Sequence, residues 1–311
     1  MHSSISYSDL SPSTVISSVK WPPIMDLDST RLLLMLDYLE QSSQWLSEEQ
    51  LWSHQLNQLN SLVGYVKNHT EFYRKAWNSI LPLLTSQTLK KNWHQLPLVT
   101  TQQLIEYNQQ FFSEISPPAH GPVRQFTHLI KSKNSRINSL KNNAVELMDG
   151  LLPFREYVWQ KRLFRETVAR VIISDNNSLI ISKDWGKPFT GVVQTGPLHL
   201  IKGINPEELA SMIVKSEPYY LLSTVDTWSK LLDYYRENPP LNWSIQEIIL
   251  EDGLMTQEMQ HTTQLILNTA ISDRYNHPVC GIIALRCPEY NNLHVQAEQL
   301  LVEVMDNEGN P

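Results

Sequence analysis

The sequence predicts an α/β fold, in which a largely helical N-terminal region is followed by a mixed or parallel sheet covered by helices. The first third of the chain carries helix start signals and leucine-rich runs, whereas short β-branched runs bounded by turns begin at Val168. In the second part these strand-length runs alternate with segments that carry helix-capping signals. Such alternation is typical of parallel strands with covering helices.

The N-terminal elements follow from local composition. Residues 1–27 are rich in serine and proline, and we expect them to form an extended arm. Asp28 or Ser29 is a suitable N-cap for a first helix. A second helix is expected to follow Ser47, because this capping residue precedes acidic residues and Gln50.

The later elements have clearer boundaries. Asn205 before a proline, Ser223 or Thr224, and Thr256 are expected to begin three helices, the last ending near Asn268. Five runs have the length and composition of strands: Val168–Ile173, Ser178–Ile181, Gly191–Gln194, Leu198–Ile201 and Ile245–Leu250.

Several conspicuous residues have a structural interpretation. The pairs Asp149-Gly150 and Asp252-Gly253 are interpreted as turns rather than as catalytic acids, because Asp-Gly is a strong turn dipeptide. A helically spaced apolar stripe is interpreted as core: Trp228, Leu231, Leu232 and Tyr235.

Composition restricts the class of protein. The 311 residues hold one large or two modest domains, and 41% hydrophobic content with nine tryptophans supports a substantial core. No apolar run approaches the roughly 20 residues that span a bilayer. Two cysteines and a start without a signal peptide favour the cytoplasm. A net charge of −7 gives no electrostatic footprint for nucleic acid.

Four metal-capable side chains lie near the end of the chain, at the spacing H-x2-C-x6-C-x6-H. They are His277, Cys280, Cys287 and His294. Zinc commonly takes two sulfurs and two imidazoles, so a zinc site is one interpretation, and buried thiols with ordinary histidines are the other. A nucleophilic cysteine is a further alternative, but the sequence around the cysteines carries no local signature of one.

The C-terminal segment resembles the end of the large domain of adenylate-forming enzymes, in the phenylacetate–CoA ligase-like branch. The matching frame consists of Tyr275–Ala284, Cys287-Pro288, His294-Val295, Val302–Asp306, Gly309 and Pro311. Weaker matches extend upstream to about residue 50, including Leu96–Thr100 and Ile248–Thr256. The resemblance implies an adenylate-forming large domain over residues 28–311, with a mainly helical part at 28–165 and an α/β part at 166–311.

This resemblance also implies where a nucleotide or acyl substrate would bind. The implied binding residues in the α/β part are Gly253, Tyr275, Asn276 and His277. The family's glycine-rich phosphate loop corresponds to residues 125–136, which contain no glycine but offer Lys131, Lys133 and Arg136 to an anion. A solvated basic turn is the interpretation we favour for this segment, because glycine-free backbone cannot approach a phosphate closely and short charge runs are usually exposed.

The family motifs are degraded at several positions. Leu254 and Val279 stand where the family has glutamates, and the small lid domain that follows the last motif in the family is missing from this sequence. We therefore expect a binding or scaffold module, with an acyl small molecule, a carrier protein or another partner protein as its ligand. The alternative is a divergent enzyme that activates carboxylates with ATP and Mg²⁺ and receives its lid from elsewhere.

Overall fold

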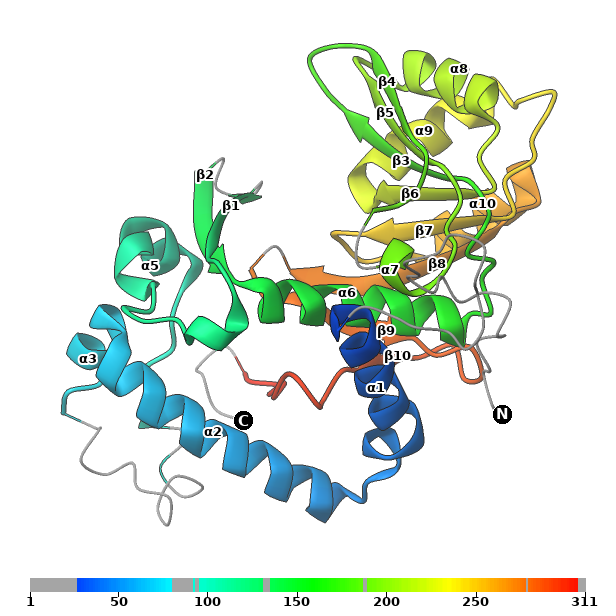
Figure 1. Cartoon of the computed structure of the whole chain (residues 1–311). Coiled ribbons are helices and arrows are strands. Elements are labelled where there is room, and N and C mark those ends of the chain that lie inside the picture. Colours follow the sequence, from blue (N-terminus) through cyan, green and yellow to red (C-terminus); the bar gives the residue numbers. More distant parts are fainter. Residues whose placement is uncertain are drawn as a thin grey trace. The chain divides into compact units, whose positions relative to one another are not determined.

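The computed structural model describes residues 27–79, 92, 95–130, 135–186, 189–277 and 279–306, so the predicted N-terminal arm lies outside the described residues. The chain forms two compact units, labelled by element in Figure 1. One takes in Asp149–Val295 with the N-terminal residues up to Leu36, and the other takes in Asp37–Met148 with the residues from Gln296 onward. No helix in the described ranges has the length and apolar character that a bilayer crossing requires.

The first unit contains a mixed sheet of eight strands, in the order β10-β9-β8-β7-β6-β3-β5-β4 within its described part (Figure 1). Strands β5, β3, β6, β7 and β8 run parallel, while β4 at one edge and β9 and β10 at the other are antiparallel to their neighbours. The bounds are β3 (Val168–Ile173), β4 (Ser178–Ser182), β5 (Leu198–Gly203), β6 (Tyr220–Thr224), β7 (Glu247–Glu251), β8 (Ala270–His277), β9 (Gly281–Arg286) and β10 (Leu293–Val295). The predicted parallel sheet is confirmed.

Three helices with capped starts cover one face of this sheet. They are α8 (Pro206–Ser216), α9 (Val225–Glu237) and α10 (Gln257–Leu267). The side chains of Asn205, Thr224 and Thr256 each accept a backbone N–H from the first turn of the following helix, as their positions before those helices predict. The predicted stripe on α9 is buried together with Ile248 and Leu250 of β7, which confirms it as core.

A second apolar cluster lies on the opposite face of the sheet. Tyr157, near the end of α6 (Asn143–Trp159), packs with Tyr220, Leu222 and Ile249. Because side chains alternate along a strand, the residues on either side of Ile249 in β7 that share its face are Glu247 and Glu251. This face is therefore apolar at its centre and charged beside it.

Two predicted elements are wrong. Gly191–Gln194 was predicted as a strand, but Phe189–Val192 form the short helix α7. Val192 and Val193 are fully buried, and a short buried β-branched run does not distinguish strand from helix. The pair Asp149-Gly150 lies inside α6 rather than in a turn. There the burial of neighbouring apolar residues along the helix outweighs the local turn preference of the dipeptide.

The second unit is mainly helical in its described part. After α1 (Leu27–Gln41), which crosses from one unit into the other, it contains η2 (Ser43–Trp45), α2 (Glu48–His69), α3 (Glu71–Ala76), α5 (Thr101–Glu106), η5 (Asn108–Phe111), η6 (Pro118–His120), β1 (Arg124–Ile130) and β2 (Ser135–Lys141). Ser47 and Gln50 form a reciprocal capping box at the start of α2, as predicted. In contrast, Asp28 lies in the first turn of α1 rather than at its N-cap.

Residues from the end of the chain complete this second unit. Ser43 Oγ donates to Glu298 Oε1 at 2.9 Å, and Gln55 Nε2 of α2 donates to the carbonyl of Ala297 at 2.9 Å. The paired residues are more than 240 positions apart in sequence. The unit is therefore closed by contacts between its first and last segments.

Candidate functional site

The carboxyl edge of the parallel strands is where ligands usually bind in α/β sheets. At this edge β7 ends at Glu251, and the chain turns through Asp252 at φ 57° and Gly253 at φ 154°. A Cβ at Gly253 would lie 2.8 Å from Cβ of Val225, at the start of α9. Both the backbone angle and the close approach therefore require glycine. The predicted turn at Asp252-Gly253 is confirmed.

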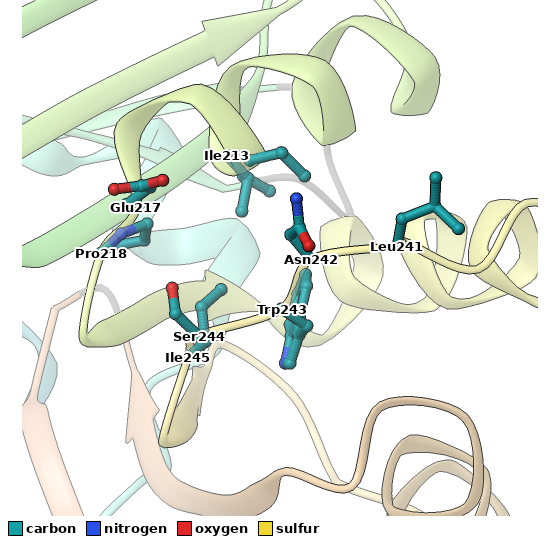
Figure 2. A pocket seen from close by; sticks show the side chains of 9 residues that line it. Ile213, Glu217, Pro218, Leu241, Asn242, Trp243, Ser244 and Ile245 are labelled. Atoms are coloured by element: carbon teal, nitrogen blue, oxygen red, sulfur yellow. The ribbon is translucent and has the colours of Figure 1, made fainter.

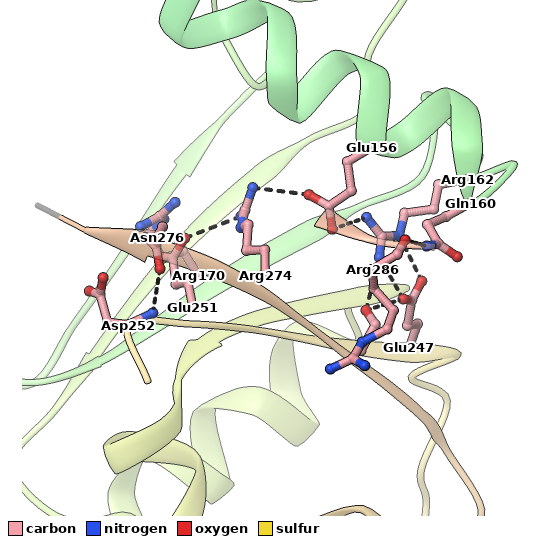
Figure 3. Close-up of polar contacts among 11 residues, drawn as sticks. Glu156, Gln160, Arg162, Arg170, Glu247, Glu251, Asp252, Arg274, Asn276 and Arg286 are labelled. Carbon is pink, nitrogen blue, oxygen red and sulfur yellow. Dashed lines mark hydrogen bonds and ion pairs between the residues drawn. The ribbon is translucent and has the colours of Figure 1, made fainter. Parts of the chain in front are cut away.

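The end of β8 is tied to this turn. Asn276 Oδ1 accepts the backbone N–H of Asp252 at 2.7 Å, which ties a predicted binding residue to the predicted turn (Figure 3). The pairing of β8 with β9 is irregular between Tyr275 and Asn276. Tyr275, one of the predicted binding residues, is 44% exposed. The edge thus offers an accessible aromatic surface beside a backbone turn.

A charge network of alternating arginine and glutamate side chains extends from this edge across the sheet face beneath α6 (Figure 3). Arg170 of β3 donates to Glu251 at 2.5 Å, and Arg274 of β8 bridges Glu251 and Glu156 at 3.1 Å each. Glu156 in turn accepts from Arg162 at 2.8 Å. Exposure of the side chains falls from 43% at Arg170 to 1% at Arg162.

At the buried end of this charge network, every guanidinium nitrogen of Arg162 donates a hydrogen bond. Arg162 also donates to both carboxylate oxygens of Glu247, at 2.6 and 2.8 Å, and to Ser272 Oγ at 3.0 Å. These bonds form a bidentate pair, the strongest arrangement of guanidinium and carboxylate. The three arginines and three glutamates are equal in number, so the network carries no net charge.

The network sets the ionisation of its central carboxylate. Burial acts to raise the pKa of Glu156, but the charges of Arg162 and Arg274 and the Arg162 hydrogen bond together act more strongly in the opposite direction. Its pKa therefore lies below the usual value of 4.5. Glu156 is ionised at neutral pH and holds both arginines in place.

This network is the part of the site that sequence reasoning missed. Its members come from α6, the loop after it, β3, β7 and β8, so no local motif contains them. One signal was present in β7, where Glu247, Ile249 and Glu251 share a face. Glutamates at alternate positions of an otherwise buried strand predict buried partners of opposite charge.

The four predicted zinc ligands are not brought together. His277 ends β8 and Cys280 lies in the following turn, whereas Cys287 follows the far end of β9 and His294 of β10 lies opposite Leu285, near that same end. The six residues of β9 span about 20 Å, far more than the roughly 2 Å between zinc and each ligand. Within the described ranges no three His, Cys, Asp or Glu side chains gather as a metal centre requires. The strand between the two pairs excludes the zinc interpretation.

Cys280 lacks the activated character of a nucleophile. Both cysteines are free thiols, and desolvation raises the pKa of Cys280 above its usual value. A raised pKa lowers the thiolate fraction at neutral pH, which is the opposite of what a nucleophile needs. His277 Nδ1 accepts the backbone N–H of Val279, so this imidazole is used in closing the turn.

The segment aligned with the phosphate loop belongs to the second unit. It contributes to the antiparallel pair β1 and β2, rather than to the predicted solvated turn alone. Arg136 is an exposed residue of β2 opposite Leu129, while Lys131 and Lys133 lie outside the described residues. The sequence missed this antiparallel strand pair because its strands contain few consecutive β-branched residues.

A pocket of about 380 Å³ lies at the opposite, amino-terminal end of the strands (Figure 2). Its lining comes from the end of α8 and from the segments before β6 and β7: Ile213, Val214, Glu217, Pro218, Leu241, Asn242, Trp243, Ser244 and Ile245. None of the predicted site residues belongs to this lining. The pocket is therefore separate from the carboxyl edge described above.

Comparison with solved structures identifies the fold. The chain is similar to 2-hydroxyisobutyryl-CoA ligase in complex with 2-HIB-AMP and CoA in the thioesterification state, with a TM-score of 0.55 and 13% identity over 80% of this chain and 54% of that chain. It is also similar to the same ligase with 2-HIB-AMP in the postadenylation state, with a TM-score of 0.55 and 13% identity over 82% of this chain and 53% of that chain. No protein-family model and no curated protein matches the sequence.

Proposed function

We propose that this chain is a binding domain built on the adenylate-forming fold and that it does not activate carboxylates with ATP. The mixed α/β fold is that of the acyl-CoA ligases above, of whose length the chain spans about half. The ligases' activity is not inherited with the fold, because function depends on the residues of the site. The phenylacetate–CoA ligase-like branch is also part of this proposal, and it is supported by the C-terminal sequence motifs.

The observation that carries the proposal is the engagement of Glu251. Its carboxylate accepts from Arg170 and from Arg274, so the acid at the end of β7 is neutralised by protein cations. A magnesium–nucleotide complex requires carboxylates that are free to face the metal and its phosphates. The nearby position 254, where the family has glutamate, is an exposed leucine. Both features oppose ATP chemistry at this edge.

The same edge supports binding of an acyl carboxylate. Arg170 is 43% exposed and offers guanidinium N–H groups beyond those that contact Glu251. The exposed ring of Tyr275 at the end of β8 suits the apolar part of an acyl group. A ligand that contacts both this ring and Arg170 would have to reach over the sheet edge, because alternation along β8 puts Tyr275 on the face opposite Arg274. An acyl small molecule is therefore the ligand we favour, with Gly253 and Asn276 shaping the turn. A carrier protein bearing such a group, or another partner protein, is the alternative.

The test combines calorimetry with a turnover assay. The purified chain is titrated with ATP and Mg²⁺, and pyrophosphate release is measured with aryl acids and fatty acids. We expect no pyrophosphate release and no heat from ATP. In a parallel thermal-shift series, we expect a carboxylic acid to raise the melting temperature of the wild type but not of Arg170→Gln. Acid-dependent release of pyrophosphate would overturn the proposal.

One observation favours the alternative of a divergent active enzyme. Tyr275, which the resemblance places in the nucleotide site, has an accessible ring at the carboxyl edge. In that case ATP binds, and Lys131→Ala and Lys133→Ala weaken its affinity while the melting temperature stays nearly unchanged. An ATP affinity that is unchanged in Lys131→Ala, Lys133→Ala and Tyr275→Ala would remove this alternative.

A further inference from the structure

The edge strand β4 has an unusual surface for the border of a sheet. Its sequence is Ser178-Leu179-Ile180-Ile181-Ser182, without a charge or a proline. The three central residues are 42%, 53% and 61% exposed. Exposed edge strands normally carry charges, prolines or bulges that prevent pairing with another chain. None of these devices is present in β4.

One side of β4 has backbone groups available for pairing. The strand is antiparallel to β5, and no other strand of the described residues contacts it. Alternate N–H and C=O groups therefore point away from the sheet, as in every edge strand. Leu179 and Ile181 lie opposite Ile201 and His199 on one face, and Ile180 lies opposite Leu200 on the other. A strand added here would meet apolar side chains on both faces.

The sequence of β4 matches itself when it is reversed. If two copies pair antiparallel about a two-fold axis at Ile180, Leu179 lies opposite Ile181 of the second copy and Ser178 lies opposite its Ser182. In an isologous interface each such contact occurs twice, and both Leu–Ile and Ser–Ser are compatible cross-strand pairs. No insertion or bulge is needed to keep this register.

We propose that β4 is a homodimerisation edge, at which two copies of this chain join their sheets through antiparallel β4 strands. A five-residue strand supplies only part of the roughly 800 Å² that each partner buries in a standard interface. The association is therefore expected to be reversible and concentration-dependent. This inference does not depend on the proposed function, because β4 and the carboxyl-edge residues are different parts of the sheet.

Sedimentation velocity of the full chain from about 1 to 100 μM tests the association, over the range expected of a small interface. We expect a shift from the 36.0 kDa monomer toward twice that mass. Ile180→Lys puts two like charges at the dyad and should raise the dissociation constant at least about tenfold. Ile204→Lys is the matched control, because Ile204 is 54% exposed but follows β5. It should leave the dimer unchanged.

A cross-linking experiment tests the register. With Cys280 and Cys287 replaced by serine, Ile180→Cys should form a disulfide-linked dimer under mild oxidation, whereas Ile204→Cys should not. Circular dichroism establishes that each variant is folded. A monomer at every concentration would overturn the proposal, as would a dimer that Ile180→Lys does not weaken. Equal cross-linking at positions 180 and 204 would overturn the register.

Discussion

Glu156 Oε1 accepts a hydrogen bond from Arg162 Nη1 at 2.8 Å, and both side chains are almost completely removed from solvent. The pair joins the end of α6 to the loop that leads into β3. Through Glu247, Arg162 also ties this loop to β7. One guanidinium thus links the end of α6, the loop into β3 and the start of β7.

Glu156→Gln is expected to lower the free energy of unfolding by about 3–5 kcal/mol at pH 7, because it leaves two arginines beside a neutral group in a buried site. Urea unfolding followed by circular dichroism measures the change. Glu258→Gln is the control, since its partner Arg236 is on the surface and such pairs contribute about 0–1 kcal/mol. Equal losses in the two variants would contradict a special role for the buried pair.

The pH dependence of stability should reveal the same carboxylate. Its pKa is lowered by folding, so its contribution to stability is complete above the unfolded value of 4.5 and is lost as the pH falls through the folded value. The stability difference between wild type and Glu156→Gln should therefore be constant from pH 6 upward and shrink below pH 4.5. Urea unfolding at a series of pH values measures it. A stability difference that grows on acidification would show that folding raises the pKa of Glu156 instead of lowering it.

Two tyrosines of unlike environment should respond differently to truncation. Tyr275→Ala is expected to cost less than about 1 kcal/mol, because the ring is 44% exposed. Tyr235→Ala removes a ring from the core beneath α9 and should cost about 3–5 kcal/mol. Thermal unfolding of the two variants beside wild type provides the comparison. A large loss for Tyr275→Ala would mean that its ring is covered.

The hydroxyl of Tyr235 gives a prediction of opposite sign. It is buried without a hydrogen-bond partner among the described residues, and burial raises the pKa of this phenol. Tyr235→Phe keeps the ring and removes the unsatisfied group, so it should raise stability by about 1 kcal/mol. Chemical denaturation resolves a change of this size. Destabilisation would indicate that the hydroxyl has a water or protein partner.

Gly253→Ala should lower stability by about 1–3 kcal/mol, because alanine is strained at φ 154° and its Cβ meets Val225. The matched control is Gly64→Ala, at a helical site where a Cβ has no neighbour within 4 Å and alanine is the better helix former. That substitution should be neutral or stabilising. A melting curve for each variant distinguishes the two outcomes.

Local physical chemistry explains which elements were predictable. Ser47, Asn205 and Thr224 cap helices through contacts within four residues, so their role is visible in a short window of sequence. The stripe on α9 follows from helical periodicity in the same way. The pair Asp149-Gly150 failed because its environment is set by the packing of the whole of α6, which a dipeptide rule does not contain.

The site was less predictable for a related reason. Asn276 and the Asp252-Gly253 turn could be placed together because parallel strands end at one edge. The partnership of Arg162 with Glu247 spans 85 positions, and that of Arg274 with Glu156 spans 118. Ion pairs between residues so far apart in sequence can be predicted only after the strand order is known. The predicted zinc site failed for the same reason, because the six residues between Cys280 and Cys287 form the strand β9 and hold the two cysteines apart.

The contacts of Ser43 with Glu298 and of Gln55 with Ala297 also constrain the order in which the chain acquires structure. During synthesis α2 leaves the ribosome long before its C-terminal partners exist. The contacts that close the second unit therefore cannot form until the residues of the sheet have been synthesised. Closing so long a loop carries an entropic cost that local helix contacts do not. Completion of the helical unit is accordingly expected to follow synthesis of the sheet residues.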